Sequence, residues 1–179
     1  GFVVSGYHGV MGDRLADARQ PAMAERAYLQ SLAAYPRYEY AWRLGVVEMG
    51  LKRYDRARAA FEKAAQLDPD NREALTELGS ALTGLGRFAE ADSVLARVVA
   101  LHPRGAGEAL IYRARLHFHQ GDAVAGRHWL NEARRTLPPR DPAWRDVRRL
   151  EDELKRAGVA GGAPSPRGDA PGDTPPTPR

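Results

Sequence analysis

The chain has 179 residues, of which 43% are hydrophobic, and this is enough to bury the core of one domain. It contains no cysteine, which excludes a disulfide framework, a thiolate zinc site and a cysteine nucleophile. Its formal net charge of +4 arises from interspersed basic and acidic residues, a pattern that argues against nucleic acid as a partner.

A repeat of 33 to 35 residues is marked by prolines at Pro36, Pro69, Pro103 and Pro138. The residue 24 places before each proline is small, namely Gly12, Gly45, Gly79 and Ala114. The residue 12 places before is also small, namely Ala24, Ala57, Ala91 and Gly126. The residue 8 places before is large and apolar, namely Tyr28, Phe61, Leu95 and Leu130. Because these columns share one frame, the chain is predicted to be an array of similar units.

The spacing within one unit predicts two antiparallel helices. Small residues let two helix backbones approach closely, so we expect Gly45 on the first helix to meet Ala57 on the second. Phe61, one turn after Ala57, is expected to fill the space towards the next unit. The proline ends the second helix because it cannot continue the backbone hydrogen bonding. Gly86 and Gly121 stand in the turns inside their units, where glycine adopts a positive φ at little cost.

The best-preserved unit, residues 38–71, resembles the tetratricopeptide repeat (TPR), whose pattern is W-x2-L-G-x2-Y, A-x3-F and P. The matching residues are Leu44, Gly45, Ala57, Phe61 and Pro69. Two departures are that Trp42 stands one place late and that Glu48 occupies the tyrosine position. The resemblance implies an all-α fold, an α-solenoid of four helix-turn-helix units, in chain order at residues 5–37, 38–71, 72–105 and 107–140.

Three segments flank the predicted array. Residues 1–4 form an apolar N-terminal segment. Residues 141–157 are predicted to be a capping helix that starts at Asp141 and Pro142. Its apolar stripe consists of Trp144, Val147, Leu150 and Leu154. Residues 158–179 are rich in proline and glycine and predict a disordered tail.

The resemblance also implies that the first helices line a concave groove, which binds a partner polypeptide. The implied partner-binding residues are Trp42, Val46, Met49, Thr76, Ser80, Ile111, Arg115 and Phe118. The apolar anchors among them are Trp42, Met49, Ile111 and Phe118. We expect these anchors to be exposed on the concave wall; the alternative is that another helix or the tail of the chain covers them.

One TPR subclass binds C-terminal carboxylates with a clamp of lysine, asparagine and arginine side chains. The five matching positions here hold Gly9, Asp13, Arg43, Glu73 and Glu77. Only Arg43 fits, so the clamp is not expected in this chain. The groove is instead predicted to be apolar with acidic patches, which suits a ligand with apolar anchors and some basic residues.

No pattern in the sequence predicts catalysis, a cofactor or a metal site. It contains no phosphate-binding glycine loop, no G-x-S-x-G and no H-E-x-x-H motif. His117 and His119 are two residues apart, so they point to different faces of one helix, and no carboxylate at a suitable spacing completes a ligand set. The chain is therefore not predicted to be an enzyme.

Two functions stay open for a non-catalytic array. The first is an adaptor that holds a protein or peptide partner in the concave groove. The second is a structural subunit of a larger membrane-bound or filamentous assembly, which contacts its neighbours through its termini and outer faces. No apolar run approaches the length of a membrane span, although the apolar start at Gly1–Val4 is compatible with an upstream anchor. The richness in arginine and alanine is typical of a GC-rich bacterial genome, and both the cytoplasm and the cell envelope remain open as compartments.

Overall fold

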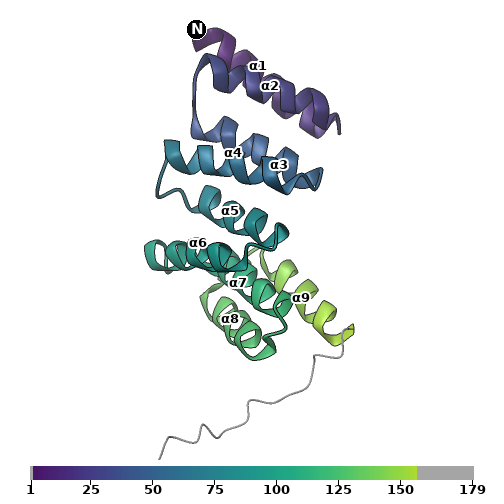
Figure 1. Ribbon diagram of the computed structural model, residues 1–179, viewed down its shortest axis with the longest axis vertical. Helices are drawn as coiled ribbons and strands as arrows, with labels where there is room; N and C mark the ends of the chain where they lie inside the picture. Colours follow the sequence, from purple (N-terminus) through teal and green to yellow (C-terminus); the bar gives the residue numbers. More distant parts are fainter. Residues whose placement is uncertain (1, 157–179) are drawn as a thin grey trace, which may run out of the picture.

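The computed structural model describes residues 2–156, with side chains from residue 9 onward. All regular secondary structure in this part of the chain is helical (Figure 1). The helices are α1 (Phe2–Asp17), α2 (Pro21–Ala34), α3 (Tyr38–Gly50), α4 (Tyr54–Leu67), α5 (Arg72–Gly84), α6 (Phe88–Leu101), α7 (Gly107–His119), α8 (Ala123–Thr136) and α9 (Trp144–Arg156). The predicted all-α fold is confirmed.

Consecutive helices form four antiparallel pairs that stack along the long axis of the molecule (Figure 1). Each second helix also packs against the first helix of the following pair, which connects the hydrophobic clusters of neighbouring units. First helices touch one another as well, since α5 contacts α3 and α7. The arrangement is an α-solenoid of four helix-turn-helix units, with α9 packed on the last unit.

The four turns inside the pairs share one backbone feature, a residue with a positive φ. These residues are Arg19 (56°), Lys52 (57°), Gly86 (72°) and Gly121 (79°). The prediction of a positive φ for both glycines is confirmed. Glycine adopts this conformation without a Cβ clash, whereas each of the two basic residues adopts it at a cost of about 1 kcal/mol.

In the first three pairs, a large side chain of the second helix lies directly on a glycine of the first helix. The three contacts are Gly12 with Tyr28, Gly45 with Phe61, and Gly79 with Leu95. A Cβ atom added to any of these glycines would overlap the larger side chain. The Phe61 ring is the nearest neighbour of a Cβ atom added at Gly45, so the close approach at this glycine involves Phe61. The contact of Gly45 with Ala57 stays a prediction.

Phe61 also serves the role that its spacing predicts. Its side chain is completely buried, in one hydrophobic cluster with Ala57 of its own pair and Leu78 and Leu82 of the next pair. The same ring thus covers the glycine of its own unit and joins that unit to the following one. Because this side chain packs both on the glycine of its own unit and against the next unit, the residue at this position of the repeat must be large and apolar.

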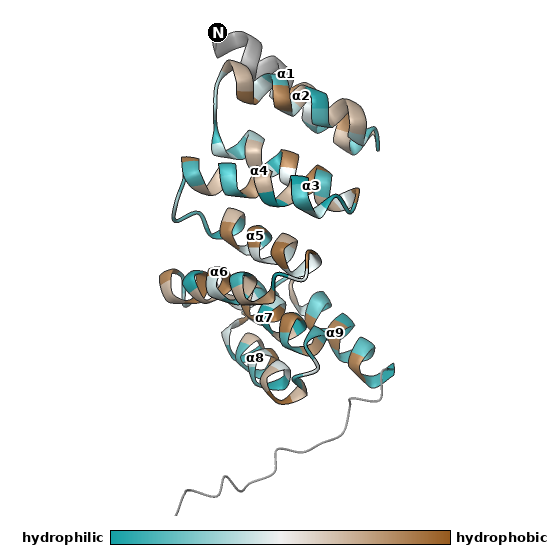
Figure 2. Cartoon of the chain, in the orientation of Figure 1, coloured by the Kyte–Doolittle hydropathy of each residue, from teal (hydrophilic) through white to brown (hydrophobic). Residues whose placement is uncertain are grey.

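α9 covers the open side of the last pair. It begins at Trp144, two residues later than predicted, because residues 141–143 form a turn in which Asp141 Oδ1 accepts a hydrogen bond from the Ala143 backbone N–H (2.8 Å). Val147 and Leu150 are buried against α7 and α8. Figure 2 shows hydrophilic and hydrophobic residues alternating along α9, as expected for a helix with one apolar stripe.

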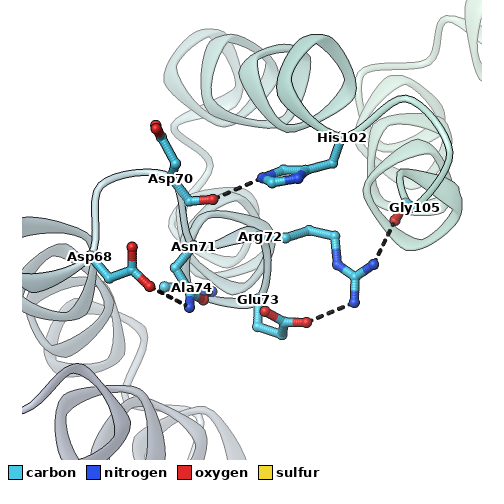
Figure 3. Close-up of polar contacts among 8 residues, drawn as sticks. All are labelled: Asp68, Asp70, Asn71, Arg72, Glu73, Ala74, His102 and Gly105. Carbon is cyan, nitrogen blue, oxygen red and sulfur yellow. Dashed lines mark hydrogen bonds and ion pairs between the residues drawn. The ribbon is translucent and has the colours of Figure 1, made fainter.

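Polar contacts hold the loops between units together (Figure 3). Asn71 Oδ1 accepts a hydrogen bond from the Ala74 backbone N–H (2.9 Å), which caps α5. In the following loop, His102 Nε2 lies 2.8 Å from the Asp70 carbonyl oxygen. These contacts fix the spacing of neighbouring loops and hence the register of the units they connect.

The ends of the array are placed as follows. α1 begins at Phe2, so it includes most of the segment 1–4 that the sequence pattern separates from the first unit. The predicted tail at 158–179 lies outside the described residues. None of the described helices is long and apolar enough to cross a membrane.

Candidate functional site

The surface formed by the first helices α1, α3, α5 and α7 carries the predicted partner-binding residues, and we call it the groove. On α3, Val46 is 41% exposed. Trp42 and Met49 are half-buried and pack against the hydrophobic cluster around Phe61. Because residues 42, 46 and 49 are four and three places apart, they share one face of α3. We call these three residues the apolar strip.

Two of the predicted partner-binding residues are buried, so the expectation that a partner can reach them is wrong. Thr76 is 3% exposed and Ile111 is 2% exposed. They occupy equivalent positions in the third and fourth units. Thr76 lies on α5, which contacts α7, and Ile111 lies on α7, which contacts α9. Val147 and Leu150 of α9 belong to the cluster that encloses Ile111. The alternative that another helix covers an expected anchor therefore holds for Ile111.

Ser80, Arg115 and Phe118 are half-buried. Phe118 packs against the hydrophobic cluster beneath α9. Together with Leu150 and Leu154, Arg115 and Phe118 line a hollow of 230 Å³ at the end of the groove. α9 therefore shields part of Phe118 while leaving this hollow open beside it.

A pair of acidic side chains lies in the groove between α5 and α7, and we call Glu77 and Glu108 the acidic pair. Burial, together with the Glu108 carboxylate, raises the pKa of Glu77 to about 7. Burial and the Asp146 carboxylate raise the pKa of Glu108. Burial, followed by both glutamates, also raises the pKa of the hydroxyl of Tyr112, which stands one turn after Glu108 on α7. These shifts share a direction because burial is the largest cause of each.

The neighbouring Glu73 differs from the acidic pair because it already has a cation. Figure 3 shows Arg72 donating hydrogen bonds to Glu73 Oε1 (2.7 Å) and to the Gly105 carbonyl oxygen (3.5 Å). Although burial raises it, hydrogen bonds from its own backbone amide and from Arg72 lower the pKa of Glu73 overall. No cation among the described residues lowers the pKa of Glu77, so Glu77 is the carboxylate of this region that a ligand cation would relieve most.

The sequence pattern did not identify the acidic pair as a site. The sequence predicts acidic patches in the groove, but it gives Glu77 only as a mismatch to the carboxylate clamp and does not indicate Tyr112. One signal was available, since Glu73 and Glu77 are four residues apart and so share a face of α5. No local signal connects α5 to Glu108 and Tyr112 on α7, because that proximity arises from the stacking of units.

Arg43, the one residue that fits the carboxylate clamp, is engaged within the chain. Its Nη1 lies 2.8 Å from Asp13 Oδ1. The same carboxylate oxygen accepts a hydrogen bond from the Tyr28 hydroxyl (2.7 Å). The guanidinium is thereby tied to α1, which removes the remaining feature that a terminal carboxylate would need.

The histidines of α7 lie in a salt-bridged surface. His117 Nε2 is 3.8 Å from Asp92 Oδ1, and its Nδ1 is 3.9 Å from Asp122 Oδ2. Arg113 donates to both oxygens of Asp92, at 2.7 and 3.0 Å, so that carboxylate is already neutralised. Within the described side chains, no three histidine, aspartate or glutamate residues are grouped to hold a metal ion.

Comparison with solved structures places the fold among known repeat proteins. MamA has a TM-score of 0.69 at 20% identity, with 91% of this chain and 98% of that chain covered. YrrB, a TPR protein with an unusual peptide-binding site, has a TM-score of 0.67 at 18% identity, with coverage of 79% and 71%. The second TPR domain of human RPAP3, in complex with an HSP70 peptide, has a TM-score of 0.58 at 20% identity, with coverage of 63% and 97%.

Sequence comparison gives the family directly. No curated protein sequence matches this chain. Two family models of the tetratricopeptide repeat do match it, one at residues 10–72 and the other at residues 48–107. Together they span more than half of the chain, and the helical pairs have the stacking that the repeat requires. The chain belongs to the tetratricopeptide repeat family.

Proposed function

We propose that the chain is a non-catalytic protein-interaction scaffold that binds a polypeptide partner in the groove. The observation that carries the proposal is the presence, on one surface, of the apolar strip of α3 and the acidic pair of α5 and α7. Apolar side chains of this kind anchor protein partners, and acidic side chains with raised pKa values favour a partner of opposite charge. The RPAP3 domain of the same fold is known in complex with a peptide.

The charge of the groove favours a partner with basic as well as apolar side chains. A lysine or arginine placed beside Glu77 and Glu108 would favour their ionised forms and lower both pKa values. The HSP70 peptide of the RPAP3 complex, SGPTIEEVD, is acidic at its end. Such a peptide would meet like charges here, and Arg43 is tied to Asp13. We therefore propose a basic partner segment rather than an acidic one.

Two labelled peptides of equal length, one alternating leucine with lysine and the other leucine with glutamate, test this proposal by fluorescence anisotropy. We expect the full chain to bind the lysine peptide, and the combined change Glu77→Gln and Glu108→Gln to weaken that binding by about tenfold or more. The matched control Glu90→Gln, on the exposed surface of α6, is expected to leave it unchanged. Equal binding of both peptides, or an unchanged affinity in the double variant, contradicts the proposal.

A second candidate function, a structural subunit of a larger assembly, is favoured by the apolar end of the array. Val10 of α1 and Met23 of α2 are each 57% exposed. Large apolar side chains exposed together mark surfaces that contact other proteins. The partners of such a subunit would meet the first pair of helices rather than the groove.

Photo-crosslinking in the source cells separates the two functions. A crosslinking phenylalanine analogue is placed at Val46 in the groove, at Met23 on the apolar end, or at Val124, which is 75% exposed on α8. The adaptor function predicts crosslinks to one protein mainly from position 46. Crosslinks mainly from position 23, to several proteins that purify together, would favour the assembly subunit, and equal crosslinking from position 124 would contradict both.

A further inference from the structure

A pocket of 520 Å³ lies between α2, α3 and α4. Leu29 and Leu32 of α2, Leu44 of α3 and Ala60 of α4 provide apolar lining. The pocket is open to solvent, since Leu29 is 49% exposed. Glu48 of α3 also lines it, and this is the residue that replaces the tyrosine of the repeat. A carboxylate thus stands where the family places an aromatic ring.

Glu48 is buried without a hydrogen bond to one of its oxygens. Its side chain is 2% exposed, and Oε2 has no hydrogen-bond partner among the described residues. Arg53 Nη1 forms a long ion pair with Oε2, at 3.6 Å, without donating a hydrogen bond to it. Burial, together with the Glu25 carboxylate, raises the pKa of Glu48. A buried acceptor in this situation carries a free-energy cost that a donor from a ligand would remove.

Two cationic side chains, Arg56 and Lys63, line the pocket, and Lys63 is exposed at its edge. The two nearby arginines donate hydrogen bonds to the other carboxylate, Glu25. Arg53 Nη1 donates to Glu25 Oε2 (3.0 Å), and Arg56 Nη1 donates to Glu25 Oε1 (3.1 Å). Both oxygens of Glu25 therefore have a cationic partner. The charge that stays without a direct donor is that of Glu48, at the inner side of the pocket.

The chemistry of the pocket excludes several classes of occupant. A wholly apolar group would seal Glu48 Oε2 away from water without giving it a donor, and an ionised acidic group likewise has no donor to offer this oxygen. A guanidinium favours two parallel hydrogen bonds, one to each oxygen of a carboxylate. The buried oxygen that lacks a hydrogen bond here is a single atom, Glu48 Oε2. An ammonium is a compact donor on a flexible aliphatic stem, which matches a single free oxygen behind apolar walls.

We propose that this pocket is a second binding site, which accepts a lysine side chain of a partner polypeptide. The ammonium donates to Glu48 Oε2, and the aliphatic stem lies against Leu29, Leu32 and Ala60. The pocket is larger than one lysine side chain, so an apolar residue beside the lysine shares it. The site is separate from the groove and does not depend on what the groove binds.

The test is a titration of the full-length ¹⁵N-labelled chain with acetyl-Leu-Lys-Leu-amide, monitored by NMR at the backbone amides of Leu29 and Ala60. The matched peptide has norleucine, which keeps the stem and lacks the ammonium. We expect the lysine peptide to bind at these amides about tenfold more tightly than the norleucine peptide, the difference that one charged hydrogen bond supplies. Glu48→Gln is expected to abolish this difference while keeping the shape of the side chain.

A second variant makes the test independent of any effect of Glu48 on folding. Ala59 is exposed on the wall of the pocket, so Ala59→Met narrows the opening without touching Glu48. We expect Ala59→Met to weaken binding of the lysine peptide, and Ala89→Met, at an exposed position on α6, to leave it unchanged. Equal shifts with the two peptides, no shift at millimolar peptide, or full binding by Glu48→Gln each overturns the proposal. Chemical-shift changes confined to the backbone amides of α5 and α7 would mean that the peptide binds only in the groove, and they would also overturn the proposal.

Discussion

Phe61→Ala is expected to lower the free energy of unfolding by about 3–5 kcal/mol, the usual cost of removing a buried phenylalanine ring from a core. Phe61 is completely buried. Its ring lies on Gly45 in its own unit and belongs to one cluster with Leu78 and Leu82 of the next unit. The variant therefore leaves a cavity at the contact between two units. Urea denaturation of the full chain, monitored by circular dichroism, measures the loss.

Phe88→Ala is the matched control for this prediction. It makes the same chemical change next to the same hydrophobic cluster, but Phe88 is only partly buried at the start of α6. Its cost is expected to be less than half that of Phe61→Ala, because less apolar surface is withdrawn from water there. A similar cost for both variants would contradict the placement of Phe61 at the centre of the contact between units.

Glu77→Gln is expected to stabilise the chain by about 1–3 kcal/mol at neutral to alkaline pH and to have little effect in acid. Burial and the Glu108 carboxylate raise the pKa of Glu77 from an ordinary value of 4.5 to about 7. The folded state therefore holds this proton more tightly than the unfolded state does. The stability linked to that proton is fully present below about pH 4.5 and is lost as the pH rises towards 7. A glutamine keeps the neutral form at every pH.

Unfolding curves of the original chain and the variant, taken at about pH 4 and about pH 8, measure this difference directly. Glu90→Gln is the control, since Glu90 is exposed on α6 and paired with Arg87. That change is expected to have a small effect at both pH values. If Glu77→Gln gave the same change in stability in acid and in alkali, the Glu77 carboxyl would not be held in the poorly solvated, acidic surroundings described for the groove.

The architecture could be predicted from the sequence because its determinants are local and repeated. The columns that contain Gly45, Phe61 and Pro69 recur in one frame, so each unit supports the interpretation of the others. The contacts were less predictable. The Phe61 ring lies on Gly45, which the spacing did not indicate, and α9 begins at Trp144 although it was expected to begin at Pro142. Both depend on how a side chain or a turn is oriented, which the spacing of residues does not specify.

The partner-binding residues were harder to predict than the fold, because the exposure of a side chain depends on which helices pack beside it. Thr76 and Ile111 share the face that the family uses for partners, yet α7 and α9 pack over that part of α5 and α7. Trp42, at the equivalent position of α3, is only half-buried. A residue at one position of the repeat can therefore be partly accessible in one unit and part of the core in another.

Glu48 is a residue whose unusual identity can be seen in the sequence but whose surroundings can be seen only in the structure. Its departure from the repeat pattern is visible in the sequence, where a glutamate replaces the family's tyrosine. Its consequence is visible only in three dimensions, as a buried carboxylate facing a pocket between α2 and α4. The shorter and charged side chain changes the contact between two units without changing the fold.

The sequence by itself determined the helical units, their order and their membership of the repeat family, because these follow from side-chain size and backbone preference at fixed spacing. The tertiary structure alone decided which side chains face solvent, that Glu77 lies near Glu108, and that Glu48 is buried without a donor. The physical reason is that solvation and charge interactions depend on distances between units. Those distances are set by how the helices stack, and residues far apart in the chain determine that stacking together.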